Sequence, residues 1–169
     1  MESVVCETES PISMTATAIH RRHGAGCHRC AFVDTLTPAE RSAQMSLVRS
    51  KNTKPELLLR RLLFSLGYRY RLHSRDLPGR PDLVFPMRRK IIFLHGCFWH
   101  GHSCPLGRMP KSRIGYWTEK IAGNSARDQL NLHRLGGMRW KCLVVWECQV
   151  RRGRDRAELL NRLTRFLEK

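Results

Sequence analysis

Two stretches near the start of the folded part of the chain carry apolar residues at helical spacing. The segment Thr37-Pro38-Ala39-Glu40 has the pattern of a capping box with proline at the first helical position, so we expect a helix from Thr37 to about Arg49. The segment Thr53-Lys54-Pro55-Glu56 repeats this pattern. A leucine stripe follows it and ends at Gly67, which predicts a second amphipathic helix (Leu59, Leu62, Leu63 and Leu66).

The next apolar stretches have the spacing and length of strands. Alternation over residues 68–72 predicts an exposed strand. Asp82 opens the short apolar run 83–85, and the continuous apolar run 90–94 leads directly into His95. Two adjacent strands would bring Asp82 and His95 close together. The run 138–147 is apolar on both faces, so we expect a buried central strand there.

The remaining patterns predict helices. Residues 112–120 form a helical turn that carries Tyr116 and Trp117, and a separate helix begins at Asn124 and is stopped by Gly136-Gly137. An amphipathic helix from about residue 155 to 167 closes the chain. This order of elements predicts an α/β fold with a central sheet of mixed direction flanked by helices.

Residues 1–36 show neither helical nor strand periodicity, so we interpret them as a poorly ordered extension before a domain at 37–169. The extension contains Cys27 and Cys30 with two histidines upstream, which is one arrangement for a second zinc site. Because so little chain would fold around that metal, we favour a disordered tail, or a start codon assigned too far upstream.

The formal net charge of +17 indicates a polyanionic partner, and nucleic acid is the commonest. Residues 1–36 hold three arginines against four acidic residues, so the positive excess lies in residues 37–169. The alternative is a solvated basic surface that binds nothing. No apolar run approaches the roughly 18 residues that span a membrane, and no secretory signal opens the chain, so we expect a cytoplasmic protein without a membrane partner.

The ten residues from His95 to Cys104 hold two cysteines, three histidines and two large aromatic residues. Cys97, His102 and Cys104 are ligand types that Zn²⁺ takes in a structural site, and Cys148 is the best candidate for the fourth ligand. The alternative is that these cysteines are inert buried residues. With seven cysteines and no export signal, we do not expect a disulfide framework.

Asp82 at the start of a strand is a natural Mg²⁺ ligand, because Mg²⁺ prefers carboxylate oxygens. A Pro-Asp pair that opens a strand, followed by a second strand, is similar to the arrangement in PD-(D/E)-x-K nucleases. The second motif of that superfamily is missing, since Phe93-Leu94-His95 stands in its place. His95 and His100 are not needed for zinc, and imidazole titrates near pH 6.5 (roughly), so either histidine could accept a proton or hold a phosphate.

Three motifs in this order closely resemble the very-short-patch repair endonuclease family: residues 77–82 (LPGRPD), 95–100 (HGCFWH) and 145–148 (VWEC). The resemblance covers about residues 35–169. It implies a restriction-endonuclease-like fold with a structural zinc site. It further implies a bacterial, nucleoid-associated enzyme that recognises a T·G mispair left by deamination of 5-methylcytosine in double-stranded DNA, and that nicks 5′ of the thymine using Mg²⁺.

Taken residue by residue, the resemblance implies Asp82 and the main-chain carbonyl of Leu94 as Mg²⁺ ligands. His100 would be the general base and Asp128 the carboxylate that orients it. His95 would contact the scissile phosphate or a water molecule held by the metal. Glu56 matches a further active-site acid, although a capping role at its helix would also explain it. The implied zinc ligands agree with those chosen above (Cys97, His102, Cys104 and Cys148).

The resemblance also implies that Phe98, Trp99 and Trp117 wedge into the DNA beside the mispair, while the first helix, with Met45, lies in the opposite groove. Packing of these aromatic residues onto the core is the alternative. We expect a monomer, with mismatch-repair proteins as candidate partners.

Three other functions compete with this interpretation. One is a restriction-type or homing-type nuclease on the same fold. Another is a zinc-stabilised DNA-binding module without catalysis, which leaves Asp82 unexplained because a carboxylate beside a phosphate weakens binding unless a cation lies between them. The third is a catalytic zinc hydrolase, which four protein ligands on the zinc would exclude.

Overall fold

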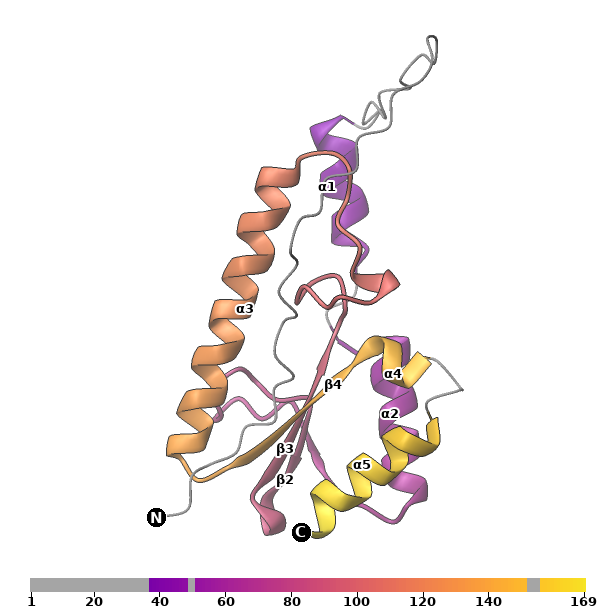
Figure 1. The fold of residues 1–169 in the computed structure, drawn as a ribbon, viewed down its shortest axis with the longest axis vertical. Helices are drawn as coiled ribbons and strands as arrows, with labels where there is room; N and C mark the ends of the chain where they lie inside the picture. Colours follow the sequence, from indigo (N-terminus) through magenta and orange to yellow (C-terminus); the bar gives the residue numbers. More distant parts are fainter. Residues whose placement is uncertain (1–36, 49–50, 152–155) are drawn as a thin grey trace, which may run out of the picture.

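The computed structural model describes residues 37–48, 51–151 and 156–169. Figure 1 shows a central sheet with one long helix along one side and a group of shorter helices along the other. The expected extension at 1–36, including Cys27 and Cys30, lies outside the described residues. In the described part, no helix combines the length and the apolar character needed to cross a membrane.

The sheet has four strands in the order β1-β2-β3-β4. They are β1 (Arg71–Leu72), β2 (Leu83–Phe85), β3 (Lys90–His95) and β4 (Lys141–Trp146). The pairs β1/β2 and β2/β3 are antiparallel, whereas β3/β4 is parallel. This arrangement confirms the predicted mixed sheet. It also confirms that Asp82 precedes β2 and that His95 ends the neighbouring strand β3.

The prediction of a central position for the strand at 138–147 is wrong. β4 pairs only with β3 among the described strands, so it lies at an edge of the sheet, and Val145 is its one buried residue. Its two faces are nevertheless apolar because each packs against helices. Leu143 and Val145 contact the core on one side, and Cys142 and Val144 contact the core on the other.

Two apolar cores cover the two faces of the sheet and make a three-layer structure. The larger core joins α2 (Lys54–Ser65) and α5 (Arg156–Glu168) to the sheet, through residues that include Leu63, Ile92 and Leu163. The smaller core joins α3 (Ile114–Gly137) to the opposite face, through residues that include Leu135, Ile91 and Phe93. Alternate residues of β3 therefore enter opposite cores, as the two-residue period of a strand requires.

The helix α3 is a single element of 24 residues, whereas the sequence predicted two helical segments. The helix continues through Gly123, which costs roughly 1 kcal/mol relative to alanine and does not stop a helix that packs along a sheet. The predicted end at Gly136-Gly137 is confirmed. At the other end of the chain, α1 (Pro38–Ser46) begins with the predicted capping box between Thr37 and Glu40. In Figure 1, α1 lies near the amino-terminal end of α3, away from the sheet.

Candidate active site and metal cluster

A cavity of about 640 Å³ opens beyond the carboxyl ends of β3 and β4. Ligands of open α/β sheets commonly bind at such an edge. The residues that line the cavity include most of those predicted to act in catalysis or to bind DNA (Met45, Glu56, Asp82, Leu94, His95, Trp99, His100 and Asp128). These residues come from α1, α2, α3, β3 and the segments beside β2 and β3. The fold thus brings together residues that lie far apart in the sequence.

Asp82 is held at this edge by a backbone contact with the neighbouring strand. The N–H of Leu94 donates to Oδ2 of Asp82 at 2.7 Å. Burial raises the pKa of Asp82, and the nearby Glu56 carboxylate raises it further, although the Leu94 hydrogen bond opposes both effects. No lysine or arginine forms an ion pair with Asp82 in the described part of the chain. A partly buried carboxylate that faces a second carboxylate suits a hard divalent cation.

Glu56 is buried and has several polar partners. Its Oε2 atom accepts hydrogen bonds from Arg60 Nη2 at 2.8 Å and from the Asn52 N–H at 3.0 Å. The Thr53 hydroxyl donates to Oε1 at 3.0 Å but does not cap the helix, and Glu56 accepts from the Asn52 N–H rather than from that of Thr53. The predicted capping box is therefore not formed. The guanidinium of Arg60 also contacts the ring of His73. No pattern of residues marked Arg60 beforehand, because its spacing fits an ordinary exposed helix position.

His95, His100 and Asp128 form a compact group in the cavity. Nδ1 of His100 lies 2.5 Å from Oδ2 of Asp128, and Nδ1 of His95 lies 4.0 Å from the same oxygen. The two imidazole rings are stacked, with centroids 4.0 Å apart and an interplanar angle of 11°. Burial and, to a smaller extent, the adjacent His100 lower the pKa of His95 to about 4, although Asp128 opposes this shift. His95 is therefore neutral at physiological pH.

The stacked arrangement decides what this group can do. Because the two rings are nearly parallel, their in-plane lone pairs do not converge on a single point, which disfavours a metal ion shared by both histidines. The short contact to Asp128 fits an Nδ1–H donor on His100, and leaves Nε2 of that ring free to accept a proton. The geometry therefore supports acid–base chemistry at His100.

A second cluster contains the four residues predicted to bind zinc. One ligand atom from each of Cys97, His102, Cys104 and Cys148 lies within 4.8 Å of the others. A tetrahedral zinc site with ligand distances of roughly 2.0–2.3 Å separates neighbouring ligand atoms by about 3.6 Å. The Cys148 Sγ to His102 Nδ1 distance is 3.6 Å, as that geometry requires. These residues therefore fit a structural zinc ion.

The three thiols of the cluster differ in pKa. For Cys104, burial raises the pKa, but hydrogen bonds with His102 and Cys97 outweigh burial and lower the pKa to about 6. Burial raises the pKa of Cys97 to about 12 and also raises that of Cys148. A coordinating cation deprotonates such thiols, because the thiolate is the ligand. Cys97, Cys104 and Cys148 form no disulfide, so no disulfide competes with a metal for them in the described part.

The backbone around the cluster depends on two glycines. A Cβ atom on Gly107 would lie 1.8 Å from the carbonyl oxygen of His102, so no larger residue fits there. Gly101 has a φ of +69°, and a Cβ atom there would lie 2.9 Å from Ile121. Cys148 lies in α4 (Glu147–Arg151), directly after β4. Its N–H donates to Cys97 Sγ at 3.4 Å.

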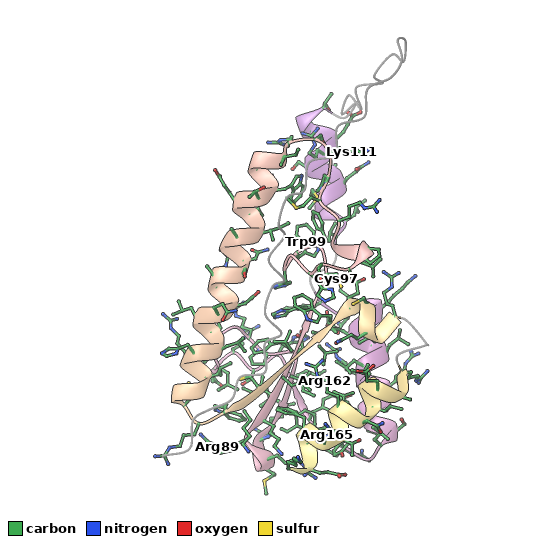
Figure 2. The ribbon with its side chains drawn as sticks, viewed as in Figure 1. Arg89, Cys97, Trp99, Lys111, Arg162 and Arg165 are labelled. Carbon is green, nitrogen blue, oxygen red and sulfur yellow. The ribbon has the colours of Figure 1, made fainter. Side chains whose placement is uncertain are left out.

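The aromatic residues predicted to contact DNA lie together. The ring of Phe98 is 5.0 Å from the ring of Trp99 and 5.0 Å from that of Trp117, in edge-to-face contacts. Tyr116, whose side chain is 49% exposed, extends this group through its contact with Trp117. Figure 2 shows Trp99 and Cys97 in the loop beyond the ends of the strands. Met45 lines the same cavity from α1.

Sequence reasoning assigned no function to several residues around the site. Arg80, Asn131 and Glu147 also line the cavity. Arg80 has a φ of +49° in the turn before Asp82, and its unusual backbone could not be inferred from composition. The only sequence signals for Arg80 and Glu147 were their places in the LPGRPD and VWEC motifs.

Similar proteins are known. The model of the family described as "DNA mismatch endonuclease Vsr" matches residues 33–106, which include Asp82 and the His95–Cys104 loop. The chain is 54% identical over 119 residues to the type II nicking enzyme V.XorIIP of Xanthomonas oryzae pv. oryzae, covering 70% of this chain and 88% of that protein. It is 44% identical over 137 residues to the type II nicking enzyme V.NmeAIP of Neisseria meningitidis, covering 81% and 98%. It is 42% identical over 125 residues to the DNA mismatch endonuclease Vsr of Escherichia coli, covering 74% and 80%.

Proposed function

The chain belongs to the Vsr family of DNA mismatch endonucleases, and on that basis we propose that it nicks duplex DNA 5′ of the thymine in a T·G mispair. Membership makes it a DNA endonuclease. The proposed mispair arises by deamination of 5-methylcytosine, and the nick would start its repair. The observation that carries the proposal is the placement of Asp82, His95 and the His100–Asp128 pair around one cavity.

His100 is proposed as the general base. Asp128 accepts its Nδ1–H and so fixes the ring with Nε2 available to take a proton from the attacking water. The carboxylate also stabilises the imidazolium that forms, and this favours proton transfer. His95 supports His100 by stacking, and as a neutral imidazole it can donate one hydrogen bond to the scissile phosphate or to a water molecule beside it.

Asp82 and the main-chain carbonyl of Leu94 are proposed to hold the catalytic Mg²⁺. When bound there, Mg²⁺ supplies positive charge that stabilises the phosphate as negative charge builds up during cleavage. Glu56 lies in the same cavity, where hydrogen bonds donated by Arg60 and by the Asn52 N–H fix its carboxylate in place. Glu56 thus adds negative charge on the side of the cavity that would face the cation.

The DNA partner is supported by the charge of the chain and by the aromatic group. The formal charge of +17 favours phosphate contacts on double-stranded DNA. We propose that Phe98, Trp99 and Trp117 insert beside the mispair, since apolar side chains can unstack a base step, and that Met45 contacts the opposite groove. Unstacking costs least at a mismatch, so insertion can contribute to selectivity.

Residues 37–169 are proposed to form one domain with a restriction-endonuclease-like fold, which acts as a monomer. The order of strands and the position of Asp82 before β2 support this fold. Zinc at Cys97, His102, Cys104 and Cys148 would hold the loop that carries Phe98, Trp99 and His100 against α4. Four protein ligands close that site, which supports a structural role for this ion rather than a catalytic one.

The alternatives predict different behaviour of one variant. In the proposed nuclease, Asp82→Asn should lower the single-turnover nicking rate on a T·G duplex roughly 10³-fold in the presence of Mg²⁺, because several kcal/mol of charge stabilisation are lost. Its affinity for that duplex should be retained or increased. Asp76→Asn, which removes an exposed carboxylate from the same loop, is the matched control and should nick normally.

Two of the three competing functions give other outcomes of this experiment. Tight binding by the wild type without any nicking would assign a zinc-stabilised DNA-binding module. Equal cleavage of the mispaired and the fully paired duplex would assign a restriction-type nuclease.

A further inference from the structure

Trp146 connects the two clusters of the site. It is the last residue of β4 and the register partner of His95 in the parallel pair β3/β4. On one side, its indole stacks on the ring of His102, with centroids 4.3 Å apart and an interplanar angle of 20°. On the other side, it meets the ring of His95 edge to face, with centroids 5.4 Å apart. The indole thus lies between the zinc cluster and the catalytic histidines.

The backbone of Trp146 is fixed by side chains from two helices. Its N–H donates to Oε1 of Gln149 in α4 at 3.0 Å. Nη1 of Arg162 in α5 donates to the same oxygen at 3.5 Å, and Nη2 of Arg162 donates to the carbonyl of Val144 at 3.2 Å. Figure 2 shows Arg162 on the side of the sheet that α5 covers. These contacts fix the backbone at the end of the strand, from which the indole projects between the rings of His102 and His95.

The rings of His102, Trp146, His95 and His100 therefore form a continuous series, and Asp128 holds the last ring. Close-packed rings transmit displacement, because there is little free space for one ring to move without its neighbour. His102 at the start of the series is a ligand of the proposed zinc site. Ligation would fix the plane of that imidazole, and the indole would then rest on a rigid surface.

We propose that Trp146 is a positioning residue, which holds His95, and through it His100, at the angle required for nicking, with His102 as its support. This inference rests on the proposed function, because it concerns the rate of the same reaction. It assigns the zinc cluster a role in catalysis that goes beyond holding its loop. It also explains why a large aromatic residue, rather than an aliphatic one, ends β4.

A purely structural role for Trp146 is the alternative, and three variants separate the two. Trp146→Leu removes both ring contacts and keeps an apolar side chain. Trp146→Phe restores a ring that can meet His95 edge to face. Trp140→Leu is the matched control, since Trp140 is also half-buried and precedes the same strand, but its ring contacts Arg89 rather than the site.

Three measurements on zinc-loaded protein are needed: zinc content, affinity for a T·G duplex, and the single-turnover nicking rate at saturating enzyme. We expect Trp146→Leu to keep its zinc and its affinity but to nick between about 10-fold and 10²-fold more slowly, the effect of a small misplacement of catalytic groups. Trp146→Phe should recover most of the rate, and Trp140→Leu should nick like the wild type.

A readout independent of activity follows the rings themselves. In NMR spectra without DNA, Trp146→Leu should shift the side-chain resonances of both His95 and His102, whereas Trp140→Leu should leave them in place. Wild-type nicking by Trp146→Leu, unchanged His95 resonances, or joint loss of zinc and affinity in both Trp146 variants would overturn the inference. If the wild-type protein fails to nick a T·G duplex, the proposed function fails, and the inference that Trp146 serves that reaction falls with it, even where the resonances still shift.

Discussion

Nδ1 of His100 lies 2.5 Å from Oδ2 of Asp128, a contact between a loop after β3 and the middle of α3. The loop is attached to α3 at a second point, where Nδ2 of Asn124 donates to the carbonyl of Trp99 at 2.7 Å. The proposed general base therefore has its orientation set by the long helix. This dependence makes Asp128 a direct test of the chemistry assigned to His100.

Asp128→Asn should slow nicking without weakening DNA binding. The amide of the variant carries no charge to stabilise the His100 imidazolium. It can also donate a hydrogen bond to Nδ1 of His100, which would favour the tautomer with its proton on Nε2, where the base must be unprotonated. We expect the single-turnover rate to fall about 10²-fold to 10⁴-fold. Glu119→Gln removes an exposed carboxylate from the same helix and should have no such effect. A normal nicking rate in Asp128→Asn would contradict the assignment of His100 as the general base.

Removal of one zinc ligand should destabilise the protein and release the loop that carries His100, although no catalytic side chain is itself replaced. We expect Cys148→Ser to lose its zinc, to lower the free energy of unfolding by on the order of 4 kcal/mol, and to abolish nicking. Cys142→Ser, a half-buried cysteine of β4 outside the cluster, is the control and should keep its zinc. Metal analysis and thermal unfolding measure both effects. Full nicking by a zinc-free, folded Cys148→Ser would refute the ligand assignment.

Stability should fall in mild acid because of His95. Its pKa is about 4 in the folded protein, where burial disfavours the charged ring, against an ordinary value near 6.5. At a pH between these two pKa values, His95 binds a proton in the unfolded chain but not in the folded chain. The neutral His95 therefore does not lower the free energy of unfolding above pH 6.5, which is about its pKa in the unfolded chain. As the pH falls from there toward the pKa of about 4 in the folded protein, the free energy of unfolding decreases.

Between pH 7.5 and pH 5 this loss should amount to on the order of 2 kcal/mol, measured by urea unfolding at each pH. His95→Gln should show a smaller loss over the same interval, because the residue no longer titrates. His133→Gln, which replaces an exposed histidine on α3, should behave like the wild type. An unchanged pH dependence in His95→Gln would mean that the imidazole of His95 is not held neutral by the fold.

The aromatic group can be tested for insertion against core packing. Phe98→Ala should weaken binding to a T·G duplex by roughly 1–3 kcal/mol, the cost of losing one stacked base contact, and should reduce the preference for mispaired over paired DNA. Phe64→Ala removes an exposed phenylalanine of α2 and should leave both unchanged. A large fall in melting temperature without a change in preference would instead assign Phe98 to packing.

Local patterns predicted a large part of the fold. The short apolar run after Asp82 forms β2, and the run that leads into His95 forms β3, as expected. Both could be predicted because strand periodicity and turn residues lie within a few positions of each other. The edge position of β4 could not be predicted, since coverage by helices on both faces gives the same apolar pattern as a central strand. The continuity of α3 through Gly123 likewise depends on packing against the sheet rather than on propensity.

In the candidate site, too, local patterns predicted some residues, whereas others depend on contacts between distant segments. Ligand chemistry alone selected Cys97, His102, Cys104 and Cys148, and the fold brings these four residues together. The roles of Arg60 and Trp146 depend on contacts between distant segments, namely the link from Arg60 to His73 and the ring contacts of Trp146. Trp146 stands in the VWEC motif, but that motif does not show which rings it contacts, so only the structure could identify these roles.

Strand-specific nicking of labelled duplexes that differ only in one T·G, T·A or C·G pair, with Mg²⁺ or with EDTA, tests the central claim most directly. We predict a single nick 5′ of the mispaired thymine, dependent on Mg²⁺ and absent from both paired duplexes. The claim would be contradicted if the paired duplexes were nicked as fast as the T·G duplex. It would also be contradicted if the protein bound the T·G duplex tightly but did not nick it at any Mg²⁺ concentration.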